Sequence, residues 1–349
     1  MLTKWLAPDV TDGPSLSFKN LIRVARQRHQ IRALTGWRRA RAAVPPDAET
    51  VDCSIGSTFN QRKRWEQAIK MELKKCPPKV ILSNGIAPKK WWPQTVVICG
   101  PEEPPQSHID ALIANKRRKR LNRAAFIVAT TSNVASTLIQ SGIDSRRIKI
   151  IPCALDTRHP KQRKRDSKRV RLLVPGHIAP GKGQDVLIDA FARLRKNKKD
   201  MMLRIVGDTR DQRYLEQLRV QAHGLRVQFI TKPIEFSDHF EWADMALLPR
   251  HTQGSWSSRA LESMMHGCPV IWSENPNTRE ATGGKGVICP EFTAEAFKAA
   301  IEQASLSAIE TSESGKSARD YIMATHDSRA VWKRIETVLE HLNKSNRWD

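Results

Sequence analysis

The sequence predicts an α/β protein built from two doubly wound parallel sheets. From residue 170 onwards, short apolar runs alternate with amphipathic helical segments, a pattern typical of a parallel sheet covered by helices on both faces. The chain has 349 residues, a length that suits two domains of ordinary size. A segment at 156–169 with many charges and no apolar residue separates the two halves, and it predicts a basic linker.

The second half, 170–328, gives the clearest pattern. The helix expected at 183–196 places Leu187, Phe191 and Leu194 on one face, and Gly224 is suited to end the next helix. We expect strands at 170–176, 201–208, 226–231, 245–249, 269–273 and 286–290. We expect the intervening helices at 183–196, 213–224, 238–244 and 257–267.

The first half, 1–155, follows the same rhythm. A helix at 17–28 carries Phe18, Leu21, Ile22 and Ala25 on one face. We expect strands at 2–7, 30–36, 79–85, 95–101, 125–131 and 148–153. Because sheets of this kind bind ligands at the carboxyl ends of their strands, we expect the site in a cleft between the two domains.

Positive charge is concentrated in the first half. Residues 1–170 hold 34 Lys and Arg against 13 Asp and Glu, whereas the rest of the chain holds 25 against 23. This partition predicts an anionic partner for the first half, either a phosphate-rich lipid surface or a nucleic acid. The basic segments also carry Trp37, Trp65, Trp91 and Trp92, which suit a headgroup layer or stacked bases, and composition leaves both open.

The cysteines and the hydropathy bear on the compartment. Six scattered cysteines with no C-x-x-C pair favour reduced thiols in a cytosol-like compartment and disfavour structural zinc. No window approaches the roughly 18 apolar residues of a membrane span, and the amino terminus lacks the apolar core of a signal peptide. We therefore expect a cytoplasmic protein, peripheral at the inner face of the membrane.

Six segments in order resemble the carboxyl-terminal domain of the retaining glycosyltransferases of family 4, which have the GT-B fold. They are 174–194, 203–208, 227–234, 240–249, 257–274 and 286–290. In the first half, 23–36 and 126–157 resemble the corresponding parts of the family more weakly. Residues 326–342 resemble the family's terminal helix, so we expect 329–349 to pack back towards the amino-terminal domain. The resemblance implies two Rossmann-like domains facing a cleft, with the acceptor bound by 1–155 and a nucleotide sugar by 170–328.

The segment from Gly176 to Gly183 suits the diphosphate of such a donor. Gly176, Gly181 and Gly183 let the backbone come close, and Lys182 can reach a phosphate oxygen. An ordinary strand-to-helix turn would explain the glycines but not the lysine. His177 stands where the family usually has Arg, so we expect one imidazole hydrogen bond in place of a guanidinium fork.

Two further segments match the donor side of the family. Lys232 and Ile234 lie in the segment that borders the nucleobase in the family, although a simple loop is a close alternative. Asp208 is equally suited to cap the next helix or to contact the ligand.

The helix that starts after Gln253 carries the ribose carboxylate in the family. Two Glu residues separated by seven others are usual there, and Glu262 matches the second, which holds the ribose hydroxyls. Gly254 stands in place of the first. The helix-start residues expected to face the distal phosphate are Ser255, Trp256, Ser257 and Ser258, of which the last two can cap the helix.

On the acceptor side the family's His is replaced by Glu102 and Glu103, which we expect at the cleft edge, with a solvated turn as the alternative. Gly13 matches the family's glycine-rich loop. We expect Glu262, Lys182 and Glu102 to carry the reaction. Since the chain has no D-x-D motif and no His/Glu cluster with ligand spacing, we expect no cofactor and no obligatory metal.

The function that the resemblance implies is retaining transfer of a hexose from a nucleotide-diphosphate sugar. Family habit favours a lipid-linked or lipopolysaccharide-type glycan as acceptor, at the cytoplasmic membrane face. An enzyme that glycosylates modified bases of DNA is an alternative that would also need a basic domain. A degenerate, non-catalytic polyanion-binding protein is another, motivated by His177 and Gly254.

Overall fold

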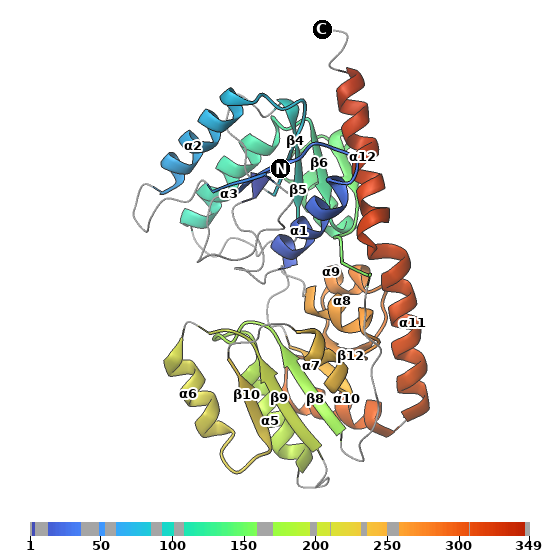
Figure 1. Cartoon of the computed structure of the whole chain (residues 1–349). Coiled ribbons are helices and arrows are strands. Elements are labelled where there is room, and N and C mark those ends of the chain that lie inside the picture. Colours follow the sequence, from blue (N-terminus) through green and yellow to red (C-terminus); the bar gives the residue numbers. More distant parts are fainter. Residues whose placement is uncertain are drawn as a thin grey trace. The chain divides into compact units, whose positions relative to one another are not determined.

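The computed structural model divides the chain into two compact units. The first comprises Met1–Asp156 and Thr325–Asp349, and the second comprises Thr157–Ala324 (Figure 1). The structure describes residues 2–3, 13–35, 49–52, 61–84, 93–100, 108–158, 170–195, 201–209, 211–231, 236–249, 258–306 and 308–345. The predicted linker is therefore described only as far as Arg158.

Within the described residues, the first unit has a seven-stranded parallel sheet in the order β3-β2-β1-β4-β5-β6-β7. Its strands are β1 Leu2–Thr3, β2 Arg32–Thr35, β3 Glu49–Asp52, β4 Ile81–Ser83, β5 Thr95–Cys99, β6 Phe126–Ala129 and β7 Ile148–Ile150. Its helices are α1 Gly13–Ala25, α2 Gln61–Lys75, α3 His108–Leu121, α4 Ser132–Gln140 and α12 Ser328–Ser345, with a 3-10 turn η2 at Ser145–Arg147.

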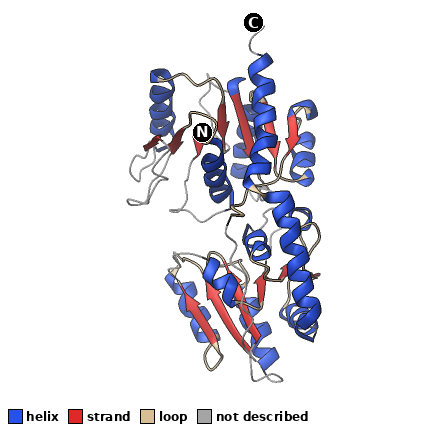
Figure 2. Cartoon of the chain, turned by 45° about the vertical axis from the view of Figure 1, so that its right-hand side comes forward, coloured by secondary structure: helices blue, strands red, loops and turns tan. Residues whose placement is uncertain are grey.

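Alternation along the strands of the first unit fills two apolar layers. On β5, Val96 packs with Phe18 of α1 and Trp332 of α12, whereas Val97 faces the opposite layer with Ile69 of α2. Successive side chains of a strand point to opposite faces of its sheet, so each strand contributes to both layers. Helices therefore cover both faces of this sheet (Figure 2).

The second unit repeats the plan. Its six-stranded parallel sheet has the order β10-β9-β8-β11-β12-β13 within the described residues. The strands are β8 Val170–Pro175, β9 Met201–Val206, β10 Val227–Ile230, β11 Met245–Leu248, β12 Val270–Ser273 and β13 Val287–Cys289. The helices are α5 Gln184–Arg195, α6 Gln212–Gln221, α7 Ser237–Trp242, α8 Ser258–Met265, α9 Pro276–Ala281, α10 Ala294–Leu306 and α11 Ala308–His326.

Both sheets reverse their strand order at one point. In the second unit the chain moves outwards from β8 to β9 and β10, then crosses back to β11 on the other side of β8. Sheets of this kind bind ligands at such a switch point, outside the carboxyl ends of the two central strands. The carboxyl ends of β8 and β11 are therefore where a ligand site is expected.

The two chain crossings between the units are tied to each other. The Leu155 N–H donates to the His326 carbonyl at 2.8 Å, and the Ser328 N–H donates to the Leu155 carbonyl at 3.0 Å. Leu155 and Asp327 form an isolated parallel bridge, and the Cys153 carbonyl lies 2.9 Å from His326 Nδ1. The start of α12 is thereby fixed against Cys153 and Leu155, just before the point where the chain first passes from the first unit to the second.

The predicted fold class is confirmed, and the differences concern single elements. β3 was not predicted, because Glu49–Asp52 holds two carboxylates and one aliphatic side chain, yet it pairs as the outermost strand. α2, α3, α4, α9, α10 and α11 were also not predicted. Gly13, expected in a loop, is the first residue of α1. None of the described helices is long and apolar enough to cross a membrane.

Candidate functional site

The glycine-rich segment from Gly176 to Gly183 lies at the switch point of the second sheet. It follows β8 directly, and Gly176, Gly181 and Gly183 have φ values of 133°, 74° and 80°, which favour glycine. A Cβ added at Gly183 would lie 2.7 Å from the Cβ of Pro249, which follows β11, and 2.7 Å from the Phe292 ring. The segment is therefore packed across the ends of both central strands.

The end of β9 reaches the same place through a glycine that the sequence did not single out as a site residue. A Cβ added at Gly207 would lie 1.7 Å from the Gly176 carbonyl oxygen, so no side chain fits there. The Gly176 N–H donates to the Val206 carbonyl at 2.8 Å, and the Ile178 N–H donates to the Asp208 backbone carbonyl at 2.9 Å. The close backbone contact fixes the first turn of the glycine segment.

His177 and Asp208 pair across this contact. His177 Nδ1 lies 3.1 Å from Asp208 Oδ1, and both side chains are exposed. Asp208 was expected to cap α6 or to contact a ligand, and the capping alternative is wrong. Asp211 is the cap, with its carboxylate accepting from the Tyr214 N–H at 2.9 Å. The pairing through Nδ1 leaves His177 Nε2 as the ring nitrogen that a ligand can contact.

Gln184, the first residue of α5, supports the same segment and was also missed. It is buried, and its Nε2 donates to the His177 carbonyl at 2.9 Å. Its Oε1 is buried and accepts no hydrogen bond from the described part of the chain. Lys182 belongs to the segment too, and its N–H donates to the Ala179 carbonyl at 3.2 Å.

Glu262 lies on α8, all of whose residues are buried. Its Oε2 is 2.5 Å from Arg259 Nη1, and the two side chains are 10% and 9% exposed. Burial raises the pKa of Glu262, while Arg259 and a hydrogen bond with Ser258 oppose that rise. Among the described residues nothing donates to Glu262 Oε1, although this atom is buried. A carboxylate oxygen thus remains available for a hydroxyl donor.

Arg259 orients this carboxylate, and the sequence reasoning overlooked it. Its guanidinium carbon lies 3.6 Å from the centre of the Phe236 ring, an arrangement that fixes the plane of the fork. The three-residue spacing from Arg259 to Glu262 places both on one side of a helix, and this spacing was readable in the sequence. Removing one partner of a buried pair of this kind destabilises the folded protein, because the other charge stays buried without compensation.

Several predicted site residues fall outside the described residues. Ser258 is described as the first residue of α8, and Gly13 as the first residue of α1. The structure says nothing of Glu102, Glu103, Lys232, Ile234, Gln253, Gly254, Ser255, Trp256 and Ser257.

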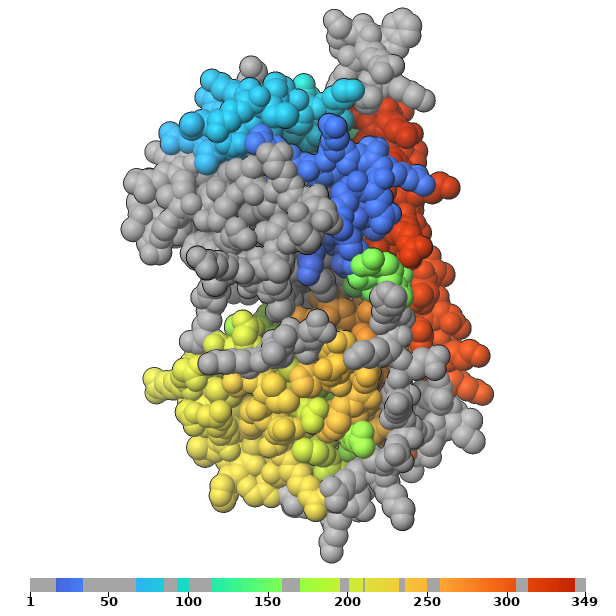
Figure 3. Space-filling model, in the orientation of Figure 1, coloured from blue at the N-terminus to red at the C-terminus, as the bar shows by residue number. Residues whose placement is uncertain are grey.

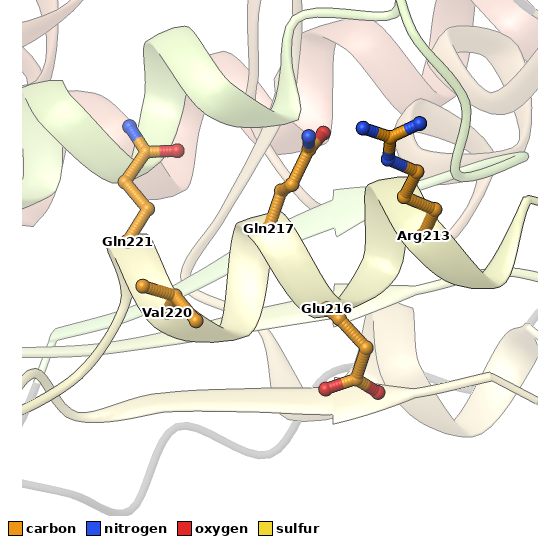
Figure 4. A pocket seen from close by; sticks show the side chains of 5 residues that line it. All are labelled: Arg213, Glu216, Gln217, Val220 and Gln221. Carbon is orange, nitrogen blue, oxygen red and sulfur yellow. The ribbon is translucent and has the colours of Figure 1, made fainter.

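Neither a cluster of metal ligands nor a pocket with converging side chains is present among the described residues. No three His, Cys, Asp or Glu side chains among them gather as ligands for a metal ion. A shallow groove runs along α6, lined by Arg213, Glu216, Gln217, Val220 and Gln221 (Figure 4). These residues share one face of a single helix, and Val220 is 76% exposed, so no side chains converge on a ligand there.

Solved structures identify the architecture. Anabaena HepE, solved in complex with UDP-glucose, matches with a TM-score of 0.79 and 15% identity, covering 97% of this chain and 99% of that one. WaaG, a glycosyltransferase involved in lipopolysaccharide biosynthesis, matches with a TM-score of 0.73 and 17% identity over 97% and 98%. The chain has the GT-B fold.

Sequence comparison agrees over the second half of this GT-B chain. Residues 156–321 match the family model for glycosyl transferases group 1. A D-inositol 3-phosphate glycosyltransferase of Geodermatophilus obscurus is 28% identical over 202 residues, which are 50% of this chain. The match spans 44% of that relative's own length. The region matched by the family model, 156–321, contains the glycine segment and α8, and thus the residues that form the candidate site.

Proposed function

We propose that this chain is a retaining glycosyltransferase that takes a hexose from a nucleotide-diphosphate sugar. The observation that carries the proposal is Glu262, a buried carboxylate held by Arg259 with one oxygen that accepts nothing within the described part of the chain. The ribose hydroxyls of a nucleotide are hydroxyl donors suited to that oxygen. Satisfying it removes the cost of a buried unpaired acceptor.

The glycine segment suits the diphosphate of the same donor. The N–H groups of His177, Gly181 and Gly183 make no hydrogen bond within the described part of the chain. Free backbone N–H groups in left-handed turns form concave sites for anions. Lys182 adds a positive charge, and His177 Nε2 adds a donor in the charged form of the ring, because Nδ1–H is the group that donates to the Asp208 carboxylate.

In the proposed reaction the bond between the anomeric carbon and the diphosphate oxygen breaks, and a bond to the acceptor oxygen forms on the same face of the sugar. The acceptor's hydroxyl proton passes to the departing diphosphate. Lys182 and the backbone N–H groups stabilise the negative charge that develops on that leaving group. In this proposal the protein's task is to position the donor and stabilise the diphosphate, with Glu102, outside the described residues, orienting the acceptor hydroxyl.

Thermal stabilisation by UDP-, GDP-, ADP- and dTDP-sugars tests the donor assignment. A donor present at 100 times its Kd stabilises the folded state by about 2.7 kcal/mol. We expect one nucleotide class to stabilise the wild type and to lose its effect in Glu262→Gln. The matched control is Glu216→Gln, an exposed carboxylate on α6 that pairs with Arg219. Stabilisation of Glu262→Gln equal to that of the control would overturn the role of Glu262.

The acceptor side is proposed to face an anionic surface through a cationic edge, defined as the positive side chains between residues 116 and 149. This segment holds nine Lys and Arg, and its one carboxylate is Asp144. Arg118 donates to the Ser141 carbonyl at 3.2 Å, and Arg147 donates to the Asn122 carbonyl at 2.8 Å. The fixed guanidiniums join the ends of α3 and α4 to the turn before β7.

An anionic bilayer is the partner that this edge favours, because Ile139 lies 46% exposed at the end of α4, near the Ser141 carbonyl that Arg118 contacts. Each cation near an anionic surface adds on the order of 1 kcal/mol. A lipid-linked or lipopolysaccharide-type glycan at the cytoplasmic membrane face is the acceptor that fits.

Sedimentation with vesicles of phosphatidylcholine, with and without phosphatidylglycerol, tests the cationic edge. We expect binding only to the anionic vesicles, falling with salt and weakened by Lys116→Glu with Lys119→Glu. The control reverses two exposed arginines of the second unit, Arg213 and Arg219. Retention on duplex DNA with no binding to vesicles would favour the nucleic-acid alternative instead.

A further inference from the structure

Strands β8 and β9 of the second sheet carry cations on the face that α7 borders. Leu203 and Ile205 of β9 belong to the apolar layer under α5 and α6, so Arg204 between them points to the opposite face. Arg171 of β8 and Gln228 of β10 alternate in the same way, and Gln228 is paired in register with Arg204. Figure 1 shows β8, β9 and β10 side by side, and in Figure 3 the visible face of the second unit is formed largely by residues coloured yellow to gold.

The two arginines share one indole and have no acidic partner among the residues that the structure describes. The guanidinium carbon of Arg204 lies 3.7 Å from the centre of the Trp242 ring, and that of Arg171 lies 5.9 Å from it. Arg204 Nε donates to Gln228 Oε1 at 2.9 Å, and Arg171 Nη1 donates to the Trp242 carbonyl at 3.4 Å. No carboxylate of the described residues lies within 4.0 Å of either guanidinium, whereas Arg193 and Arg279 of the same unit pair with acids.

Both guanidiniums are half-buried, and they repel each other. Burial, and then the charge of Arg171, lower the pKa of Arg204. The acidic residues nearby are Asp238 and Glu241 of α7, and Asp244, whose carboxylate accepts the Arg171 backbone N–H at 2.8 Å. Two like charges partly removed from water are unfavourable unless an anion lies between them.

His239 completes the cluster with a third donor. Its Nδ1 lies 3.4 Å from Arg204 Nη1, and since a guanidinium only donates, Nδ1 accepts. Burial, and then the charge of Arg204, lower the pKa of His239, while Asp238 opposes them. The neutral ring then carries its proton on Nε2, where it can donate to a ligand.

We propose that Arg171, Arg204 and His239 form a binding site for a phosphate group, separate from the donor site. Guanidinium forks match the paired oxygens of a tetrahedral dianion, and the Gln228 amide adds a further donor at the exposed edge. Arg171 is the second residue of β8, whereas the glycine segment follows the last residue of that strand. The two sites therefore lie towards opposite ends of the same strand.

The test is a titration of the full-length protein with inorganic phosphate, followed by NMR of the His239 ring and assigned with His239→Gln. We expect a saturable shift and a rise in the pKa of His239 as phosphate binds, neither of which chloride at equal ionic strength reproduces. Losing one guanidinium should weaken phosphate roughly tenfold, in Arg204→Gln and independently in Arg171→Gln. Arg204→Lys, which keeps the charge but not the fork, should also weaken it.

Lys182→Ala separates this proposal from the donor assignment. The variant should keep the His239 response to phosphate even though it alters the glycine segment. Glycerol 3-phosphate and vesicles containing phosphatidic acid are the other two arms, and a His239 response to either one supports the site and names the source of the phosphate. A shift that does not saturate, or one that persists unchanged in both arginine variants, would overturn the site whatever the donor experiments show.

Discussion

Replacing Glu262 by alanine tests the buried pair on which the donor site depends. The change removes a carboxylate from Arg259, whose guanidinium is almost fully buried. Breaking a buried ion pair by removing one partner costs roughly 3–5 kcal/mol, because the remaining charge stays in a poorly solvated place. We expect a loss of this size in the free energy of unfolding, measured by urea denaturation.

The matched comparison is Glu302→Ala, which removes the partner of Lys298 in a pair whose side chains are 30% and 31% exposed. A pair of this kind contributes about 1 kcal/mol or less. The Arg259→Ala and Glu262→Ala changes should also couple in a double-mutant cycle by about 1 kcal/mol or more. Additive effects, or a Glu262→Ala cost no larger than that of Glu302→Ala, would refute the reasoning.

The same residue predicts a dependence on pH. Burial raises the pKa of Glu262 above its ordinary value of 4.5, so the folded chain binds more protons there than the unfolded chain. The contribution of Glu262 to the free energy of unfolding must then fall as pH rises from 4.5 through the folded-state pKa. Because Glu262→Gln removes this titration, its stability relative to the wild type should increase across that window. An unchanged difference would show that the carboxyl titrates normally.

Three further predictions follow from single contacts. Gly207→Ala should destabilise the second unit by about 3 kcal/mol or more and abolish donor stabilisation, since its Cβ would overlap the Gly176 carbonyl oxygen. At pH 8 a maleimide should label exposed Cys76 much faster than Cys289, because burial raises the pKa of the Cys289 thiol to about 11. Asp144 should titrate at about 2 by carboxyl-carbon NMR, because hydrogen bonds from Arg146 lower its pKa, so its stabilising effect is lost as pH falls from the ordinary value of 3.8 through about 2.

Each of these has a direct check. Gly224→Ala is the control for Gly207→Ala, since nothing lies within 4 Å of a Cβ added at Gly224, where the strain of the positive φ of 72° is the cost that remains. A similar cost for both variants would exclude the overlap at Gly207. Equal labelling rates, resolved by peptide mass spectrometry, would show that Cys289 is accessible. Titration of Asp144 near its ordinary 3.8 would show that its contacts with Arg146 do not persist in solution.

Local pattern was sufficient for the second sheet and insufficient for the site. The strands from Val170 to Cys289 are mostly apolar, and all but β10 have Gly or Pro next to at least one end, so their positions follow from sequence alone. The pairing of His177 with Asp208, and the approach of Gly207 to Gly176, join neighbouring strands and depend on a register that sequence does not specify. The hydrogen bond from Gln184 to the glycine segment is local. The sequence did not indicate it, because Gln184 stands among polar residues and glycines, where a buried side chain is not expected.

The position of α12 has a consequence for how the protein is made. The first unit contains both ends of the chain, and Val331, Trp332 and Ile335 of α12 are buried in the same apolar layer as Phe18. The second unit is one continuous stretch inserted between them. During synthesis, therefore, residues 1–156 leave the ribosome first, and their apolar layer stays uncovered until α12 has been made. All residues of the inserted unit have left the ribosome before α12 has. The half of the protein that is translated first is the half that completes its folding last.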